Sequence, residues 1–379
     1  MFLTSWYPTF KNPNFGIFIK EHAHAVYSAG NNMVVLALII AKSNRVLDIS
    51  VSDNKDETGV RTVLVQVNSR FKDFIYYLIP LQYIIAKRVY NKYIKDQFVP
   101  EIIHSNVIFP AGIIGHWLSS DLNKTHVITE HWSRIRGFMR IPFLSKLAEN
   151  SYKMAGSIMP VSEFLQENIL GVIPKLKREK FKVIGNVVNS DVFSYKEKLT
   201  ENGIVNLCAI ATWNKKKIPD KLPFLFIESL AGIQKKVTQK LKLTMIGGGD
   251  QLDELKAFCK QLQLEVEFTG FINKVEICEI LHSSDFLIHA STVETFGVGI
   301  AEALMTGTPV ICSKVGALPE LVDDSNGVLC NNNTDEWEIG LIKAISAKYN
   351  HKEISEVVKK RFNQKVIGRQ ITEVYFKNI

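Results

Sequence analysis

Two glutamates eight positions apart, Glu294 and Glu302, have the residue type and spacing best suited to chemistry on a ligand. Glu294 follows residues 285–290, a short apolar run that is typical of a buried parallel strand. Glu302 lies inside the helix that the apolar pattern predicts over 297–305. Ligands of open α/β sheets bind at the carboxyl ends of strands, so this strand, loop and helix are expected to form part of a binding site.

The start of that helix suits an anion, because the first N–H groups of a helix have no partner within it. The N–H groups near Thr295, Phe296 and Gly297 are expected to hold a diphosphate, and the two carboxylates to accept hydrogen bonds from sugar hydroxyls on either side. The alternative is structural. In that case Glu294 complements the helix dipole and Glu302 is solvated. Taken alone, the two glutamates leave both interpretations open.

The wider stretch resembles a known signature. Glu294-x7-Glu302, with Phe296-Gly297, Ala301-Glu302-Ala303 and a following Gly-Thr-Pro-Val, resembles the retaining GT-B glycosyltransferases of glycosyltransferase family 4. The resemblance implies a GT-B fold, with two Rossmann-like, doubly wound α/β domains that face each other across a cleft. It also implies that Glu294 contacts the donor sugar and acts in catalysis, and that Glu302 contacts the nucleotide ribose.

The first half resembles the same family in order along the chain. Gly16 follows Ser5-Trp6-Tyr7-Pro8 and matches a glycine that lets the backbone approach the donor diphosphate; a plain loop glycine is the alternative. His131 follows a strand pattern and matches a catalytic histidine that hydrogen-bonds donor or acceptor, although a lone histidine is more often structural. The three arginines that follow are expected to face an anionic acceptor or a lipid phosphate. They are Arg134, Arg136 and Arg140.

A cluster of lysines after the strand predicted over 205–211 resembles the family's diphosphate grip. The family has Gly-Arg and then Lys-Gly here; Lys221 aligns with the lysine and Lys215 with the arginine. Lysine supplies the charge but not the bidentate fork of arginine, which leaves open which member of 215–221 grips the diphosphate. A solvated charge run is the alternative. Lys221 is assigned a catalytic role, and Lys215 and its neighbour Asn214 are assigned to the donor site.

Two further turns are expected to complete the donor site. Gly248 is the middle residue of a glycine triplet that follows the strand predicted over 241–246, which permits a close backbone approach to a ligand. Phe271 and Ile272 follow a third strand, and the resemblance implies that backbone atoms there contact the base.

The 379 residues suffice for two full cores, and a hydrophobic content of 46% with 22% charged residues is ordinary for a globular protein. We expect an acceptor domain over 1–195, a donor domain over 196–360 and a last helix over 361–379 that crosses back to the first domain. There is no apolar run of about 20 residues and no signal-peptide pattern, and the five cysteines are scattered. We therefore expect buried thiols and a cytoplasmic location.

The positive charge lies in the first half. Residues 1–195 hold 23 lysines and arginines against 15 acidic residues, whereas the remainder holds 23 of each. Aromatic and basic residues also interleave over 69–98, a composition that suits a bilayer headgroup region or nucleic acid, or simply a core helix pair with solvated lysines. We expect a peripheral contact with the cytoplasmic membrane surface and no nucleic-acid partner.

The expected activity is transfer of a sugar from a nucleotide diphosphate donor to an acceptor hydroxyl, with retention of configuration. A UDP-sugar is expected rather than a GDP-sugar, and the acceptor is expected to be a lipid-linked or cell-surface glycan intermediate. No Asp-x-Asp motif is present, so we expect no metal and no other cofactor, with lysines and helix N–H groups stabilising the departing diphosphate. The alternatives are a nucleotide-sugar epimerase of the same fold and a non-catalytic sugar-binding protein.

Overall fold

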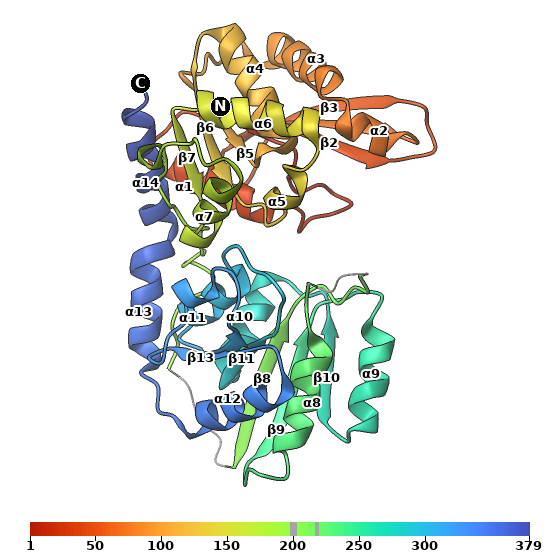
Figure 1. The fold of residues 1–379 in the computed structure, drawn as a ribbon, viewed down its shortest axis with the longest axis vertical. Helices are drawn as coiled ribbons and strands as arrows, with labels where there is room; N and C mark the ends of the chain where they lie inside the picture. Colours follow the sequence, from red (N-terminus) through yellow and green to blue (C-terminus); the bar gives the residue numbers. More distant parts are fainter. Residues whose placement is uncertain (198–202, 217–219) are drawn as a thin grey trace. The chain divides into compact units, whose positions relative to one another are not determined.

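The computed structural model describes residues 1–197, 203–216 and 220–379 (Figure 1). The chain divides into two compact units: Met1–Val187 together with Gln364–Ile379, and Val188–Asn363. The sequence places the divisions after residues 195 and 360, a few residues from these. Residues 198–202, just after the predicted division at residue 195, lie outside the described residues, and so does Lys217 of the lysine cluster.

The first unit is built on a seven-stranded sheet in the order β3-β4-β2-β1-β5-β6-β7. All neighbouring strands are parallel except β3 and β4, which pair antiparallel at one edge. The strands are β1 (Phe2–Thr4), β2 (Val34–Lys42), β3 (Asp48–Lys55), β4 (Arg61–Ser69), β5 (Ile102–Asn106), β6 (Thr125–Glu130) and β7 (Ser157–Pro160). A largely parallel sheet needs a helix layer on each face, because its central strands are apolar on both sides.

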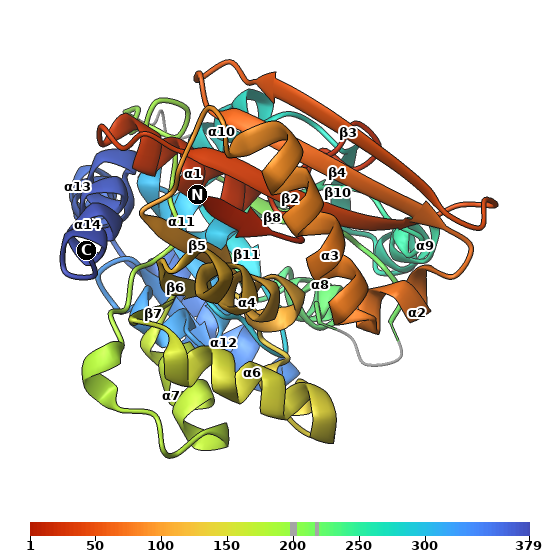
Figure 2. The same cartoon turned by 90° about the horizontal axis from the view of Figure 1, so that it is seen from above.

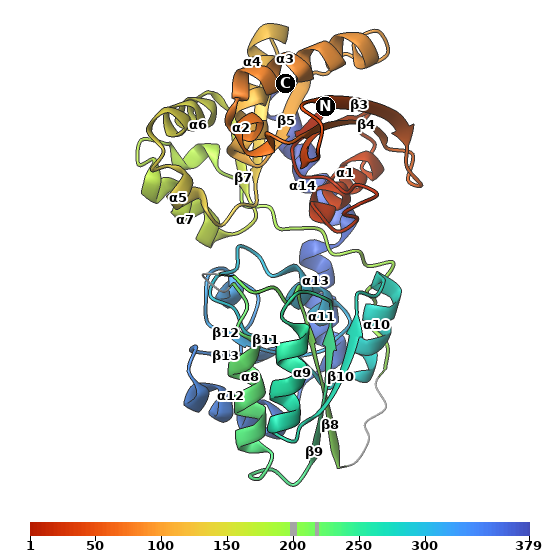
Figure 3. The same ribbon diagram turned by 90° about the vertical axis from the view of Figure 1, so that its right-hand side faces the viewer.

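Helices supply those two layers, with α4 and α6 on one face and α1 and α14 on the other (Figure 3). The helices are α1 (Ile17–Ser28), α2 (Lys72–Tyr77), α3 (Ile79–Val89), α4 (Ile113–Leu122), α5 (Ile135–Phe138), α6 (Pro142–Met154), α7 (Glu163–Val172) and α14 (Gln364–Phe376). Shorter helical turns are η1 (Tyr90–Ile94), η2 (Ile108–Gly112) and η3 (Arg178–Lys180). Figure 2 shows the same unit from above.

The second unit is a fully parallel six-stranded sheet in the order β10-β9-β8-β11-β12-β13. The strands are β8 (Ile204–Ile210), β9 (Lys240–Ile246), β10 (Glu265–Gly270), β11 (Phe286–His289), β12 (Val310–Ser313) and β13 (Gly327–Cys330). The helices are α8 (Pro223–Ile233), α9 (Leu252–Gln261), α10 (Lys274–Ser283), α11 (Val298–Met305), α12 (Thr334–Ser346) and α13 (His351–Phe362), with a short turn η4 (Leu318–Glu320).

The core of the second unit lies between its sheet and the helices α8 and α12. Trp337 is fully buried there and packs near Phe226, while Ile288 supplies a sheet residue to the same cluster. The helices α8, α9 and α12 lie on one face of the sheet, and α10, α11 and α13 on the other (Figure 3). This is the doubly wound arrangement that strands alternating with helices predict.

The last predicted helix is divided in the structure. The sequence predicts one last helix over 361–379, but α13 ends at Phe362, Asn363 is extended with ψ 161°, and α14 begins at Gln364. The two points where the chain passes from one unit to the other meet here, because the Val188 N–H donates to the Phe362 carbonyl at 2.8 Å. Over the described residues, no helix is long and apolar enough to cross a membrane.

Candidate active site

The strand order of the second unit points to one place for a ligand. β8 and β11 are neighbours in the middle of the sheet, β9 and β10 continue to one side, and β12 and β13 continue to the other. In open α/β sheets ligands bind at the carboxyl ends of the strands where this direction reverses. Lys221 comes from the segment after β8 and Glu294 from the segment after β11, so both lie at this point.

Backbone pairing brings the two segments together. The Leu222 N–H donates to the Ala290 carbonyl at 3.0 Å, and the Thr292 N–H donates to the Asp220 carbonyl at 3.0 Å. These bonds form a short antiparallel bridge between Lys221 and Ser291. The lysine position is therefore set by main-chain hydrogen bonds.

Three side chains meet at this bridge. The Lys221 ammonium donates to Glu294 Oε1 in an ion pair. His289, the last residue of β11, has its Nε2 atom 2.8 Å from the same oxygen and 3.1 Å from Lys221 Nζ. The side chains of Lys221, Glu294 and His289 are 28%, 16% and 10% exposed, so a ligand at the strand ends could reach all three.

The side chains of this cluster shift the pKa values of Glu294 and His289. Burial would raise the pKa of Glu294, but the Lys221 charge and the His289 hydrogen bond outweigh it and lower the pKa to about 2. Burial, together with the Lys221 charge, lowers the pKa of His289. At neutral pH the cluster therefore contains a carboxylate, an uncharged imidazole and a cation.

The main chain of Glu294 is held from the loop after β12. The Ala317 N–H donates to the Glu294 carbonyl at 2.9 Å. Gly316 has a φ of +54°, and a Cβ atom there would lie 2.1 Å from the Glu294 carbonyl oxygen. Only glycine fits this contact, because its missing Cβ permits both the positive φ and the close approach.

The other predicted residues of this loop and helix lie close by in the chain but in different environments. Gly297 is the N-cap of α11 in the left-handed conformation, and Glu302 lies half-buried on that helix. Thr295 is half-buried, whereas Phe296 is buried and packs edge-on against Phe362, with ring centroids 5.1 Å apart. The side chain of Phe296 therefore serves the core, and only its backbone could serve a ligand.

The loops after β8 and β9 are tied to each other. The Trp213 N–H donates to the Gly248 carbonyl at 2.9 Å, and the Asp250 N–H donates to Asn214 Oδ1 at 3.3 Å. Lys215 donates its backbone N–H to Asp250 Oδ1 at 2.7 Å, and its Nζ lies 2.8 Å from Glu254 Oε2. Lys215 thus pairs with an acidic residue of α9, whereas Lys221 pairs with Glu294.

The residues predicted to contact the base follow β10, at the carboxyl ends of the strands. Phe271 is 64% exposed and Ile272 is half-buried. The Phe271 ring lies over Gly248, where an added Cβ would be 2.5 Å from a ring carbon. A larger residue at Gly248 would displace this exposed ring.

His131 belongs to the first unit, where it directly follows β6. It is buried, its ring centroid lies 4.7 Å from that of Phe18 and 5.3 Å from that of His22, and Asn186 hydrogen-bonds its side chain. Burial, with the nearby His22, holds the pKa of His131 well below its usual range. The imidazole is therefore uncharged and ready to donate or accept a hydrogen bond.

Glu130, which the sequence analysis did not single out, fixes the backbone at His131. Its buried carboxylate accepts hydrogen bonds from the N–H groups of Ile108, His131 and Trp132 at 2.9–3.0 Å and from the Tyr152 hydroxyl at 2.7 Å. Burial, the largest influence, raises the pKa of this carboxyl group. The sequence signal for Glu130 was its place at the end of a predicted strand, because a charged side chain that is buried there needs polar partners.

The remaining predicted residues of the first unit occupy two surroundings. Gly16 caps α1 with a φ of +70°, and an added Cβ would lie 2.4 Å from the Trp6 carbonyl, so glycine is required there. The predicted acceptor-facing arginines, at the start of α5 and just beyond it, are all exposed. They are Arg134, Arg136 and Arg140.

His289 is the other residue that the sequence analysis missed. The run 285–290 has the apolar pattern of a buried strand, and His289 is the only histidine in it. The signal lay in its place as the last residue of the strand, five positions before Glu294. Strand ends, rather than loops alone, supply residues to this kind of site.

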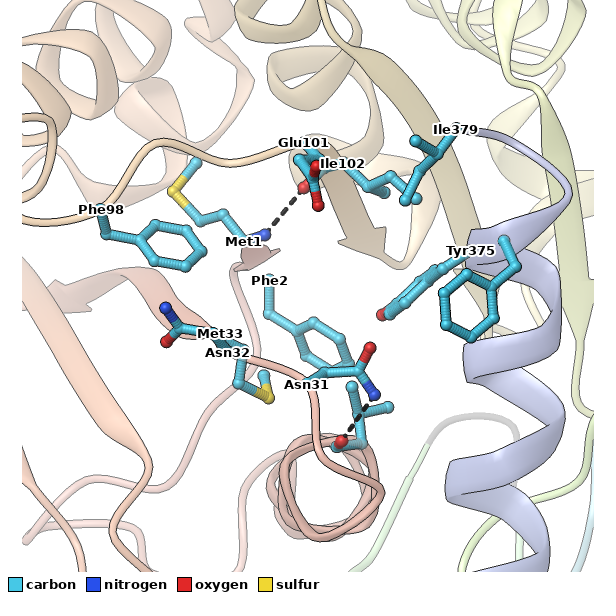
Figure 4. A pocket seen from close by; sticks show the side chains of 12 residues that line it. Met1, Phe2, Asn31, Asn32, Met33, Phe98, Glu101, Ile102, Tyr375 and Ile379 are labelled. Atoms are coloured by element: carbon cyan, nitrogen blue, oxygen red, sulfur yellow. Dashed lines mark hydrogen bonds between the residues drawn. The ribbon is translucent and has the colours of Figure 1, made fainter.

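A pocket in the first unit lies near the amino-terminal ends of β1, β2 and β5, at the opposite end of these strands from their carboxyl termini (Figure 4). Its volume is about 120 Å³, and its lining includes Phe2, Met33, Ile102 and Tyr375. Ligand pockets usually measure roughly 300–1,000 Å³. This pocket is too small for a nucleotide sugar and lies away from the strand ends that carry the predicted residues.

Comparison with known proteins finds a family match within the second unit. Residues 215–361, most of the second unit, match the family model of glycosyl transferases group 1. The chain is 25% identical over 359 residues to an uncharacterised glycosyltransferase of Methanocaldococcus jannaschii, covering 92% of this chain and 95% of that protein. It is 28% identical over 254 residues to the alpha-monoglucosyldiacylglycerol synthase of Streptococcus pneumoniae, covering 61% of this chain and 56% of that protein.

Among solved structures, Anabaena HepE in complex with UDP and glucose is similar, with a TM-score of 0.70 at 18% identity over 95% of this chain and 96% of that one. The lipopolysaccharide outer core galactosyltransferase WaaB has a TM-score of 0.72 at 18% identity, covering 100% and 99%. The fold is therefore GT-B, as the sequence predicts. The GT-B fold and the family match together support a group 1 glycosyltransferase.

Proposed function

We propose that this protein transfers a sugar from a nucleotide diphosphate sugar, favouring UDP, to an acceptor hydroxyl with retention of configuration. The observation that carries the proposal is the Lys221–Glu294 pair, which lies at the strand-order reversal within the family match. A cation beside a helix N-terminus suits a diphosphate, and a carboxylate beside it suits sugar hydroxyls. The complex of Anabaena HepE with UDP and glucose supports the choice of a UDP-sugar.

The proposed reaction breaks the bond between the anomeric carbon and the phosphate oxygen and forms a bond from the acceptor oxygen on the same face. The acceptor proton passes to the leaving phosphate oxygen. Lys221 and the first N–H groups of α11 stabilise the negative charge that develops on the diphosphate, while Glu294 orients the sugar. His131 is proposed to hydrogen-bond the donor or the acceptor, and Glu302 the ribose. We propose that no metal takes part.

The acceptor is proposed to be lipid-linked or part of a cell-surface glycan, reached at the cytoplasmic face of a membrane. The exposed arginines Arg134, Arg136 and Arg140 would face its anionic groups. The similarity to a diacylglycerol glycosylating enzyme of Streptococcus pneumoniae supports a lipid acceptor. On α2, and just before it, Phe71, Phe74 and Tyr77 are 49%, 68% and 53% exposed, which suits contact with lipid headgroups.

A thermal-shift screen with UDP, GDP, ADP and their sugars tests the donor site. One nucleotide family should raise the melting temperature, and Glu302→Ala should reduce that effect. Stabilisation by none of them would contradict the proposal. Release of free nucleotide that depends on an added acceptor then separates a transferase from an epimerase, which converts its substrate without one. A sugar-binding protein would respond to the sugar and not to the nucleotide.

A further inference from the structure

The Glu294 carboxylate shares one oxygen between two partners of different kinds. Oε1 accepts from the Lys221 ammonium, and it lies 2.8 Å from His289 Nε2. Lys221 is also the cation that a donor diphosphate would attract. The group that orients the sugar and the group that binds the diphosphate are therefore paired with each other before any donor arrives.

The protons of the cluster can be assigned from chemistry. An ionised carboxylate only accepts hydrogen bonds, so the short contact with Glu294 requires a proton on His289 Nε2. An ammonium only donates, so Lys221 and His289 Nε2 cannot bond each other and meet instead at their shared acceptor. His289 is thus an uncharged donor aimed at Glu294.

The two partners differ in their freedom to move. His289 ends β11, pairs with Cys312 of β12 in the parallel ladder, and is 9% exposed, so its ring is fixed by the sheet. Lys221 reaches Glu294 through a four-carbon stem with several rotatable bonds. A diphosphate carries more negative charge than one carboxylate and would draw the ammonium toward itself, which leaves the imidazole in place.

We propose that His289 is a positioning residue that holds the Glu294 carboxylate in its sugar-contacting orientation once the donor diphosphate has engaged Lys221. This inference rests on the proposed function. It assigns His289 a role in recognising the sugar and none in binding the diphosphate. The affinity for UDP alone should then be independent of His289. The increase in affinity from UDP to a UDP-sugar should depend on His289.

Calorimetry with UDP and UDP-glucose as probes tests this separation. His289→Leu removes the donor, and His289→Gln keeps an N–H group at a similar reach. His289→Leu should bind UDP with an affinity within about twofold of the wild-type value. The ratio of its UDP-glucose affinity to its UDP affinity should be about tenfold lower than in the wild type, because one hydrogen bond to a charged group is lost. His289→Gln should recover most of it. An unchanged ratio of the two affinities in His289→Leu would overturn the proposal.

A second measurement needs no donor. Lys221→Met mimics removal of the ammonium, and the Glu294 carboxyl can be titrated by carbon NMR in protein with labelled glutamate, assigned with Glu294→Gln. Among the described residues, the Cys312 thiol also interacts electrostatically with Glu294, and it stays protonated because burial raises its pKa. Adding His289→Leu to Lys221→Met should raise the pKa of Glu294 by about one unit, and adding His289→Gln should raise it less.

The two measurements separate the hypotheses. Wild-type protein that binds neither UDP nor UDP-glucose contradicts the UDP-sugar donor, and the NMR titration still decides whether His289 holds Glu294. Normal binding of both probes, with equal Glu294 pKa values in Lys221→Met and in the double variant, overturns the positioning role while leaving the proposed function intact.

Discussion

Lys221 and Glu294 are 73 positions apart in the chain, yet they form an ion pair across the ends of two adjacent strands. The pair joins the segment after β8 to the segment after β11, and backbone bonds between Leu222 and Ala290 set its position. Its geometry distinguishes Lys221 from Lys215 and Lys216, the other lysines of the cluster that the structure describes. Lys215 instead pairs with Glu254, and Lys216 with Asp220.

The first prediction follows from that difference. Lys221→Met should weaken UDP binding by tenfold or more, on the order of 1.4 kcal/mol, because the diphosphate loses the cation that is proposed to bind it. The matched control is Lys215→Met, whose ammonium reaches α9 and is 58% exposed, so a change of about twofold is expected. Calorimetric titration of both variants provides the comparison. Equal losses in the two would mean that both cations bind the diphosphate.

The second prediction concerns Gly316. An alanine there would place Cβ 2.1 Å from the Glu294 carbonyl oxygen, at a φ of +54° that side chains rarely adopt. Gly316→Ala should lower the free energy of unfolding by about 1–3 kcal/mol and shift the Glu294 loop. The control is Gly299→Ala in α11, where nothing lies within 4 Å of the new Cβ and helix propensity favours alanine. Urea unfolding that shows equal stability for both variants would contradict this account.

The third prediction is a loss of stability in acid. Burial lowers the pKa of His22 to about 4 and that of His126 to about 3, below the value near 6.5 expected in the unfolded chain. Both histidines stay uncharged in the native state at pH values where the unfolded chain binds a proton at each of them. Their contribution to the free energy of unfolding is therefore complete above pH 6.5 and is lost as the pH falls toward 4 and 3. Each histidine should contribute a slope of about 1.4 kcal/mol per pH unit below pH 6.

Urea unfolding between pH 7 and pH 4.5 measures that slope. His126→Gln keeps a polar group near Ser105, the partner of His126 Nε2 at 2.9 Å, but cannot take up a proton. Its stability should fall less steeply with pH than that of the wild type, although it starts lower at pH 7. Parallel curves for the two proteins would mean that His126 does not resist protonation.

The fourth prediction concerns lipid surfaces. Phe74 is 68% exposed on α2 of the basic first unit, and Phe74→Ser should reduce sedimentation with vesicles of anionic phospholipid several-fold. Val275→Ser, at a 59% exposed position of the second unit, serves as the control and should leave binding unchanged. Added salt should weaken the binding of all three proteins. Equal sedimentation of both variants and the wild type would remove α2 from the proposed membrane surface.

The sequence predicted the fold well because its cues were local and repeated. The apolar run 285–290 marked the parallel strand β11, and the apolar pattern over 297–305 marked the helix that forms as α11. The break at Asn363 escaped prediction because the apolar pattern continues across it, although α13 belongs to the second unit and α14 to the first.

The sequence predicted only part of the candidate site, because some of its contacts form between segments that are far apart in the chain. The residue types and their order along the chain predicted Glu294 and Lys221 as site residues. They do not show that Lys215 forms an ion pair with Glu254. His289 and Glu130 were missed because each is the last residue of a strand and its side-chain partners come from other segments of the chain. Their roles arise from contacts between strand ends that only the folded sheet brings together.

The division of the first unit into residues 1–187 and 364–379 has a consequence for its synthesis. α14 packs on α1, where an added Cβ on Gly368 would lie 2.2 Å from the Ala25 carbonyl oxygen, and Tyr375 bonds His104 at 2.6 Å. A ribosome therefore makes the whole second unit before this helix emerges. Until then the growing chain exposes the apolar face of α1, so the unit begun first can be completed only after the other has been made.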